Sequence, residues 1–174
     1  MKVTLIAVTS IDGKTTKWEN PNIYKWTSQE DHDNFFSHIE ANNFIVLGSK
    51  TYEAAKSVIR LSDNRLTLVM THSPKKFESD AIPGQLEFTN LTPLEIIEKY
   101  QSKKDNLLLT SGETINKLFF EAGLVDEILL TIEPYIFGSG NTLLGDTKLE
   151  IEYKLLSTKK LNSKGTLLLR YSKY

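Results

Sequence analysis

Four short, nearly continuous apolar runs constrain what this chain can fold into. Residues 3–9, 44–47, 66–70 and 107–109 are rich in Val, Ile and Leu and show no regular alternation of polar and apolar positions. Such runs are typical of strands that are buried on both faces. A sheet with two buried faces needs helices on both sides, so the pattern predicts an α/β protein with a mainly parallel sheet.

Helix-start signals lie between these runs. Thr-Ser-Gln-Glu at 27–30 and Thr-Pro-Leu-Glu at 92–95 have the spacing of a capping box, in which the hydroxyl and the carboxylate each bind a free backbone N–H. The helix that begins at 27–30 is expected to place Phe35, Phe36 and Ile39 on one face.

The last third of the chain changes from alternating units to consecutive strands. A helix that opens at Gly112 is expected to end at Gly123, a residue suited to a left-handed cap, and a strand follows at 125–132. Asn-Ser-Lys-Gly at 162–165 predicts the turn of a hairpin. The strands of that hairpin are expected at 151–156 and 166–171. We therefore predict one domain over residues 1–174, with a mostly parallel mixed sheet and an antiparallel C-terminal hairpin.

Composition excludes several classes of protein. The formal net charge of −1 lacks the basic surface of a nucleic-acid binder. The absence of cysteine excludes thiol catalysis and Cys-ligated metals, and the three histidines fit no metal-ligand pattern, so no metal is expected. No apolar stretch approaches the ~20 residues of a membrane span. We expect a cytoplasmic protein that binds neither nucleic acid nor membrane.

Polar residues follow three of the predicted strands, where helix N-termini offer free N–H groups to anions. These residues are Gly48, Ser49, Lys50 and Thr51; Thr71, His72 and Ser73; and Ser111, Gly112, Glu113 and Thr114. Each group alone also fits a strand end followed by a helix cap. Together they predict a site for a multiply phosphorylated ligand such as a dinucleotide.

Acid–base candidates are few. Asp12 follows the first strand in Ser-Ile-Asp-Gly-Lys, where it could face a ligand or form a turn with Gly13. Asp31 falls in the first turn of a helix, where the helix dipole alone would favour a carboxylate. Gly-Ser-Gly at 138–140 lies between strands and predicts a flexible loop, because it does not fit the G-x-G-x-x-G pattern.

Ser-Ile-Asp-Gly-Lys at 10–14 resembles the S-x-D-G-K signature of the reductase domain of bifunctional riboflavin-biosynthesis deaminase/reductase proteins, which shares its fold with dihydrofolate reductase. Further segments agree with this family in order and spacing, so the resemblance spans nearly the whole chain. They are 27–31, 46–53, 124–127, Pro134 and 137–140. The resemblance implies a three-layer dihydrofolate-reductase-like fold.

The resemblance also implies an activity. It points to NADPH-dependent hydride transfer to a small heterocyclic, pteridine- or pyrimidine-like substrate, similar to 5-amino-6-(5-phosphoribosylamino)uracil reductase and acting on CH–NH or CH–OH groups. A homodimer is expected by the same resemblance. By position, the family's cofactor contacts fall on the three groups above and Ile115, its catalytic positions on Asp12 and Asp31, and its substrate contacts on Lys14, Trp26 and Phe35.

Two departures from the family leave alternatives open. Ser111 stands where the family usually has glycine, which favours a catalytically silent dimeric interaction module. The D-D-P-x-L-T-x-R segment of the riboflavin reductases is missing, and Leu-Ser-Asp-Asn-Arg at 61–65 is closer to the L-P-G-R of folate reductases. Together with Asp31, Arg65 favours a dihydrofolate reductase as the other alternative.

Overall fold

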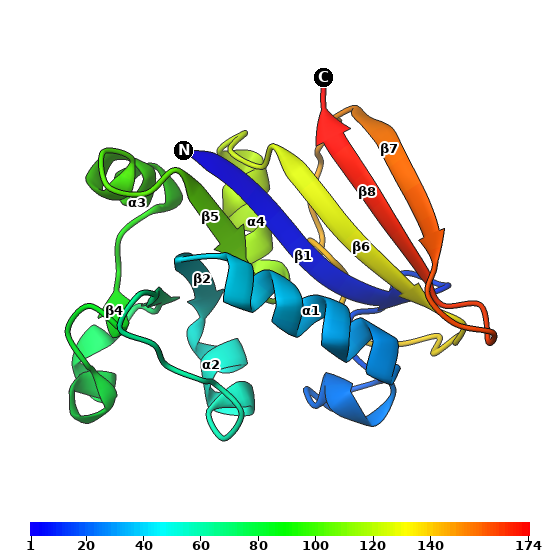
Figure 1. Cartoon of the computed structure of the whole chain (residues 1–174), viewed down its shortest axis with the longest axis horizontal. Helices are drawn as coiled ribbons and strands as arrows, with labels where there is room; N and C mark the ends of the chain where they lie inside the picture. Colours follow the sequence, from blue (N-terminus) through cyan, green and yellow to red (C-terminus); the bar gives the residue numbers. More distant parts are fainter.

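A computed structural model describes the whole chain, residues 1–174 (Figure 1). The strands are β1 (Lys2–Ser10), β2 (Phe44–Gly48), β3 (Leu66–Met70), β4 (Leu86–Thr89), β5 (Asn106–Leu109), β6 (Glu127–Glu133), β7 (Tyr153–Lys160) and β8 (Leu167–Lys173). The α-helices are α1 (Gln29–Ala41), α2 (Ser49–Ala55), α3 (Pro93–Tyr100) and α4 (Glu113–Glu121), and two 3-10 helices are η1 (Ile23–Lys25) and η2 (Pro74–Asp80).

All eight strands join one sheet in the order β4-β3-β2-β5-β1-β6-β8-β7. The six strands from β4 to β6 run parallel, β8 pairs antiparallel with β6, and β7 pairs antiparallel with β8. The expected mixed sheet with an antiparallel C-terminal hairpin is therefore confirmed. No helix of the structure is both long and apolar enough to cross a membrane.

Helices cover both faces of the sheet, which gives the three layers of the expected fold (Figure 1). One core cluster packs Ile96 and Tyr100 of α3 and Phe119 of α4 against one face of the parallel strands. A second cluster packs α1, α2 and η2 against the other face. Every residue of β2 and β3 is buried, as their apolar sequences predict.

Most of the residues predicted to begin or end a helix do so in the structure, with one exception. The capping box at Thr92 and Glu95 is present, and Gly123 has the left-handed φ of 68° that its place after α4 predicts. The first capping prediction is wrong by one residue: α1 is capped by Ser28, whose side chain accepts from Asp31 N. Thr27 instead donates to the Ile23 carbonyl one turn earlier.

Two strands have other bounds in the structure than the sequence predicted, and one strand was not predicted. The strand predicted at 151–156 lies at Tyr153–Lys160, because backbone pairing with β8 rather than side-chain pattern defines an exposed strand. The strand predicted at 125–132 begins two residues later as β6. The edge strand β4 was missed, since it has only four residues, of which Leu86 is buried and the other three are half-buried.

Candidate functional site

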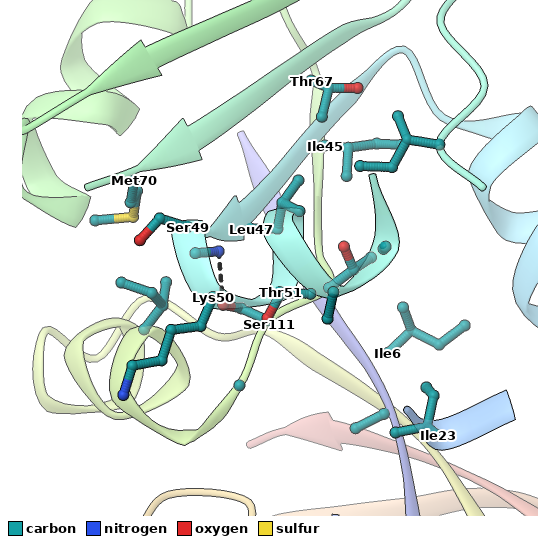
Figure 2. Close-up of a pocket in the computed structure, with 18 of the residues that line it drawn as sticks. Ile6, Ile23, Ile45, Leu47, Ser49, Lys50, Thr51, Thr67, Met70 and Ser111 are labelled. Atoms are coloured by element: carbon teal, nitrogen blue, oxygen red, sulfur yellow. Dashed lines mark hydrogen bonds between the residues drawn. The ribbon is translucent and has the colours of Figure 1, made fainter. Parts of the chain in front are cut away.

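A cavity of about 910 Å³ runs along the carboxyl ends of the parallel strands. This is the edge of an open α/β sheet where ligands bind. Its wall includes most of the predicted cofactor contacts at one end and Asp31 with Phe35 at the other. Figure 2 shows the junction of β2 and α2, with Ser49, Lys50 and Thr51 grouped beside Ser111.

The N-terminus of α4 presents uncapped backbone to the cavity. Its N-cap, Gly112, makes no side-chain hydrogen bond, so the first N–H groups of the helix have no side-chain cap. A Cβ on Gly112 would meet only Thr51 Oγ1, at 3.8 Å, which shows open space above this backbone. Uncapped N–H groups with open space above them fit a phosphate group.

Ser111 does not obstruct this backbone. Its hydroxyl accepts a hydrogen bond from Gly48 N at 2.9 Å, so the side chain is directed at the end of β2 (Figure 2). Gly48 in turn has no room for a side chain, because a Cβ there would lie 2.8 Å from Ile115 Cγ1. The serine that departs from the family pattern therefore fastens two strand ends together beside the proposed phosphate position.

Glu113 is held away from the same position. Its Oε2 accepts a hydrogen bond from Thr142 N at 3.1 Å, in the loop that follows β6. Lys50 lines the cavity with an exposed ammonium group that makes no ion pair with the protein. The charge at this end of the cavity therefore suits an anion, and the residues present fit a dinucleotide phosphate.

The other end of the cavity holds a buried carboxyl group. Asp31 is only 6% exposed, and burial raises its pKa from 3.8 to about 6, against a hydrogen bond from Thr131 that lowers it and with the Glu133 carboxylate that raises it further. Tyr24 and Phe36, stacked at 6.4 Å between ring centroids, line the wall nearby. A proton-holding group among aromatic rings suits a planar heterocycle with ring nitrogens.

Four predicted site residues lie outside the cavity wall: Asp12, Lys14, Trp26 and Ser73. Trp26 is buried and packs edge-on against Phe137, with ring centroids 5.1 Å apart. Trp26 is absent from the cavity wall because the loop that contains Phe137 covers it.

Asp12 is bound to the loop after β6. Its two carboxylate oxygens accept from Phe137 N at 3.2 Å and Gly138 N at 2.8 Å, and Ser10 Oγ donates to it at 2.6 Å. The hydrogen bond from Ser10 is the main cause that lowers the pKa of Asp12 to about 2. The loop predicted to be flexible is therefore tied to the segment after β1 by hydrogen bonds.

Arg65 is also committed to the backbone. Its guanidinium group donates to the carbonyls of Ile39 and Arg60, which fixes the loop after α2 against α1. Arg65 lines the cavity, but both terminal nitrogens of its guanidinium group already donate to backbone carbonyls.

Sequence reasoning missed several residues that surround Asp31, of which Tyr24, Thr131 and Glu133 matter most. Thr131 and Glu133 are 1% and 2% exposed and lie on one face of β6, two positions apart. Polar residues at alternating positions near the end of an otherwise apolar strand are the signal that could have revealed them.

Comparison with known proteins places the chain in a family. The model of the family described as RibD C-terminal domain matches residues 1–167. The uncharacterized protein YyaP of Bacillus subtilis (strain 168) is 31% identical over 99 residues, which cover 54% of this chain and 53% of YyaP. The chain thus matches about half the length of that relative.

Two solved structures share the fold at low sequence identity. A putative riboflavin biosynthesis protein from Shewanella sp. PV-4 has a TM-score of 0.74 and 19% identity, covering 100% of this chain and 99% of that one. A pyrimidine reductase-like protein from Corynebacterium diphtheriae has a TM-score of 0.76 and 16% identity, covering 99% of this chain and 92% of that one. With the family match over residues 1–167 of 174, the chain belongs to the RibD C-terminal domain family and has the fold of a riboflavin-pathway reductase domain.

Proposed function

We propose that this protein is an NADPH-dependent reductase of a small pteridine- or pyrimidine-like heterocycle. The observation that carries the proposal is one continuous cavity with uncapped helix N–H groups at one end and a buried carboxyl group at the other. A dinucleotide and a planar substrate could share such a cavity, so that the reacting atoms meet between the two ends.

The cofactor would be held by the three strand-to-helix junctions. The N–H groups that follow Gly112 suit the diphosphate, and Thr71 with His72, at the end of β3, suits the phosphate that distinguishes NADPH from NADH. NADPH would supply the hydride. The protein's own part would be to orient both molecules and to keep water from them.

Asp31 would serve the substrate. A carboxyl group that titrates near pH 6 can hold a proton at physiological pH often enough to donate it to a ring nitrogen of the substrate. Phe35 and Tyr24 would bind the faces or edges of the ring. The chain lacks the D-D-P-x-L-T-x-R segment, which supplies the phosphoribosyl contacts in the riboflavin reductases that it resembles, and this favours a substrate without that group.

The test is a fluorescence titration of the protein with NADPH and with NADH, on the wild type and on Gly112→Ala. Micromolar binding of NADPH, clearly tighter than NADH, is the expected result. Gly112→Ala should weaken NADPH binding at least about tenfold, because a methyl group would occupy the space of a phosphate oxygen. The melting temperature should barely change, since the nearest atom to that methyl group is 3.8 Å away.

Binding should be followed by a screen of oxidised pteridines and pyrimidines for NADPH consumption. No binding of either nucleotide at millimolar concentration would reject the proposal in favour of a catalytically silent interaction module. Equal NADPH affinity of the wild type and Gly112→Ala would show that the diphosphate does not bind at the N-terminus of α4.

We also propose that the chain forms a homodimer through β7. This edge strand is exposed along nearly its whole length, and Leu155 and Leu156 are 48% and 47% exposed. Sedimentation should report a dimer that Leu155→Lys with Leu156→Lys converts to a monomer. The control is Ile136→Lys, at an apolar side chain that is 73% exposed outside β7. A wild-type monomer would contradict the proposal.

A further inference from the structure

Glu133 is a buried carboxylate without a cation. It ends β6 and is 2% exposed, yet no lysine, arginine or histidine forms an ion pair with it. Three donors satisfy it instead. Oε1 accepts from Ser28 N at 2.7 Å and from Ser28 Oγ at 2.6 Å, and Oε2 accepts from Thr166 Oγ1 at 2.7 Å. Short hydrogen bonds of this number are what a buried anion requires.

Ser28 connects this carboxylate to Asp31. The Ser28 hydroxyl donates to Glu133 and accepts from Asp31 N at 3.3 Å, as the N-cap of α1. The Asp31 carboxyl group is meanwhile bound by Thr131, which lies on the same face of β6 as Glu133. The backbone and the side chain of Asp31 are therefore both fixed from one strand.

The C-terminal hairpin reaches the same place. Thr166, immediately before β8, is fully buried, and Asn162 of the hairpin turn donates to Thr166 Oγ1 at 2.9 Å and to Glu30 Oε2 at 3.1 Å. The turn thereby holds Thr166 against Glu133 and touches the first turn of α1. Three segments far apart in the sequence meet at one carboxylate.

Several charged or titratable groups lie on the elements that pack around Asp31. They are Glu133 on β6, Tyr24 in η1, His32, Glu30 and Asp33 on α1, and Lys164 in the hairpin turn beside Glu30. Among them, the charge of Glu133 is the one that raises the pKa of Asp31, after burial itself. Tyr24 and the partly buried His32 are neutral at pH 7, because burial raises the pKa of the first and lowers that of the second.

We propose that Glu133 is the positioning residue for Asp31, an inference that rests on the function proposed above. Its hydrogen bonds hold Ser28, and with it the first turn of α1, in the position where Asp31 lines the cavity. It also places a second negative charge beside Asp31, which favours the protonated carboxyl group that a proton donor needs. Thr166, whose hydroxyl donates to Glu133, connects this arrangement to the C-terminal hairpin.

The test compares two variants that keep the shape of the site. Glu133→Gln removes the negative charge of residue 133. Thr166→Val keeps that charge but removes one of the three hydrogen bonds that stabilise it. The pH titration of the Asp31 side chain, followed by carbon NMR of the carboxyl signal, needs no substrate. The control is Glu127→Gln, which removes a carboxylate from the opposite end of the same strand, where it pairs with Lys2 and Arg170.

Different titrations of Asp31 are expected in the two variants. Glu133→Gln should move the Asp31 titration to lower pH by about one pH unit, and kcat at pH 7 should fall about tenfold. Thr166→Val should leave the titration at or above that of the wild type. Glu127→Gln should leave it in place.

An unchanged Asp31 titration in Glu133→Gln, or the same downward shift in both variants, would overturn the inference. If Glu133→Gln does not fold, a downward shift in Thr166→Val alone would overturn it. The proposed function fails separately: the expected titrations in a protein that binds no nucleotide and turns over no heterocycle would leave Glu133 in its role and reject the reductase.

Discussion

Asp31→Asn is expected to lower kcat by about 10²–10⁴, since an amide cannot give up a proton to the substrate. NADPH binding should be unchanged, because the cofactor junctions lie at the other end of the cavity. The matched control is Asp33→Asn on the exposed side of the same helix, where Asp33 accepts only from Gln29 Nε2, at 2.8 Å. Equal turnover of the two variants would show that Asp31 does not donate a proton to the substrate.

The same substitution is expected to stabilise the protein at alkaline pH. The pKa of Asp31 is raised to about 6 in the folded state, so its protonated form contributes stability that is complete below the ordinary value of 3.8 and lost as pH rises through 6. Above that pH the buried anion costs up to about 3 kcal/mol. Urea unfolding should therefore show Asp31→Asn to be more stable than the wild type by about 1–3 kcal/mol at pH 8, with little difference near pH 4.

Such a result would be informative about function. A buried carboxyl group that weakens the fold at neutral pH is expected at a site that needs it for chemistry. If Asp31→Asn were less stable than the wild type at pH 8, the carboxylate would be serving the fold, and the catalytic assignment would lose its physical support.

Gly140→Ala is expected to be the most destabilising change in the loop after β6. Gly140 has a φ of 136°, and a Cβ there would lie 2.2 Å from the Thr16 carbonyl oxygen. The backbone strain and the clash together should cost at least about 3 kcal/mol. The nearby bonds of Thr15 N to Asn141 O, at 2.8 Å, and of Asn141 N to Thr16 Oγ1, at 2.9 Å, would be lost.

Gly138→Ala provides the matched control in the same loop. Gly138 also has a positive φ, of 72°, but a Cβ there would meet nothing within 4 Å. Its substitution should cost only about 1 kcal/mol, from strain alone. Urea unfolding of both variants makes the comparison, and equal losses would show that the close approach of Gly140 to Thr16 contributes nothing.

Local sequence features were enough for most of the fold. The buried runs of β2 and β3, the capping box at Thr92 and the left-handed Gly123 each depend on residues within one turn or one strand. Such features act through backbone preference and burial, so they are readable without the rest of the chain. The order and spacing of the motifs were also enough to identify the family, which the match over residues 1–167 confirms.

The candidate site was only partly readable, because its properties come from contacts between distant segments. The sequence placed Ser111 beside a cofactor but did not show that its hydroxyl binds Gly48 N, 63 residues away. Asp12 was predicted as a catalytic residue, yet its carboxylate binds the backbone of Phe137, 125 residues away. Neither partner is suggested by local pattern.

The sequence by itself determined the type of sheet, the buried strands and the polar groups at the strand ends, since these follow from side-chain periodicity and local hydrogen bonding. Only the tertiary structure decided which carboxyl group is buried in the cavity. Asp31 and Glu133 lie more than 100 positions apart in the chain, and they meet because packing α1 onto the sheet sets Ser28 against the end of β6. Desolvation and charge then change the chemistry of Asp31, and both depend on that packing.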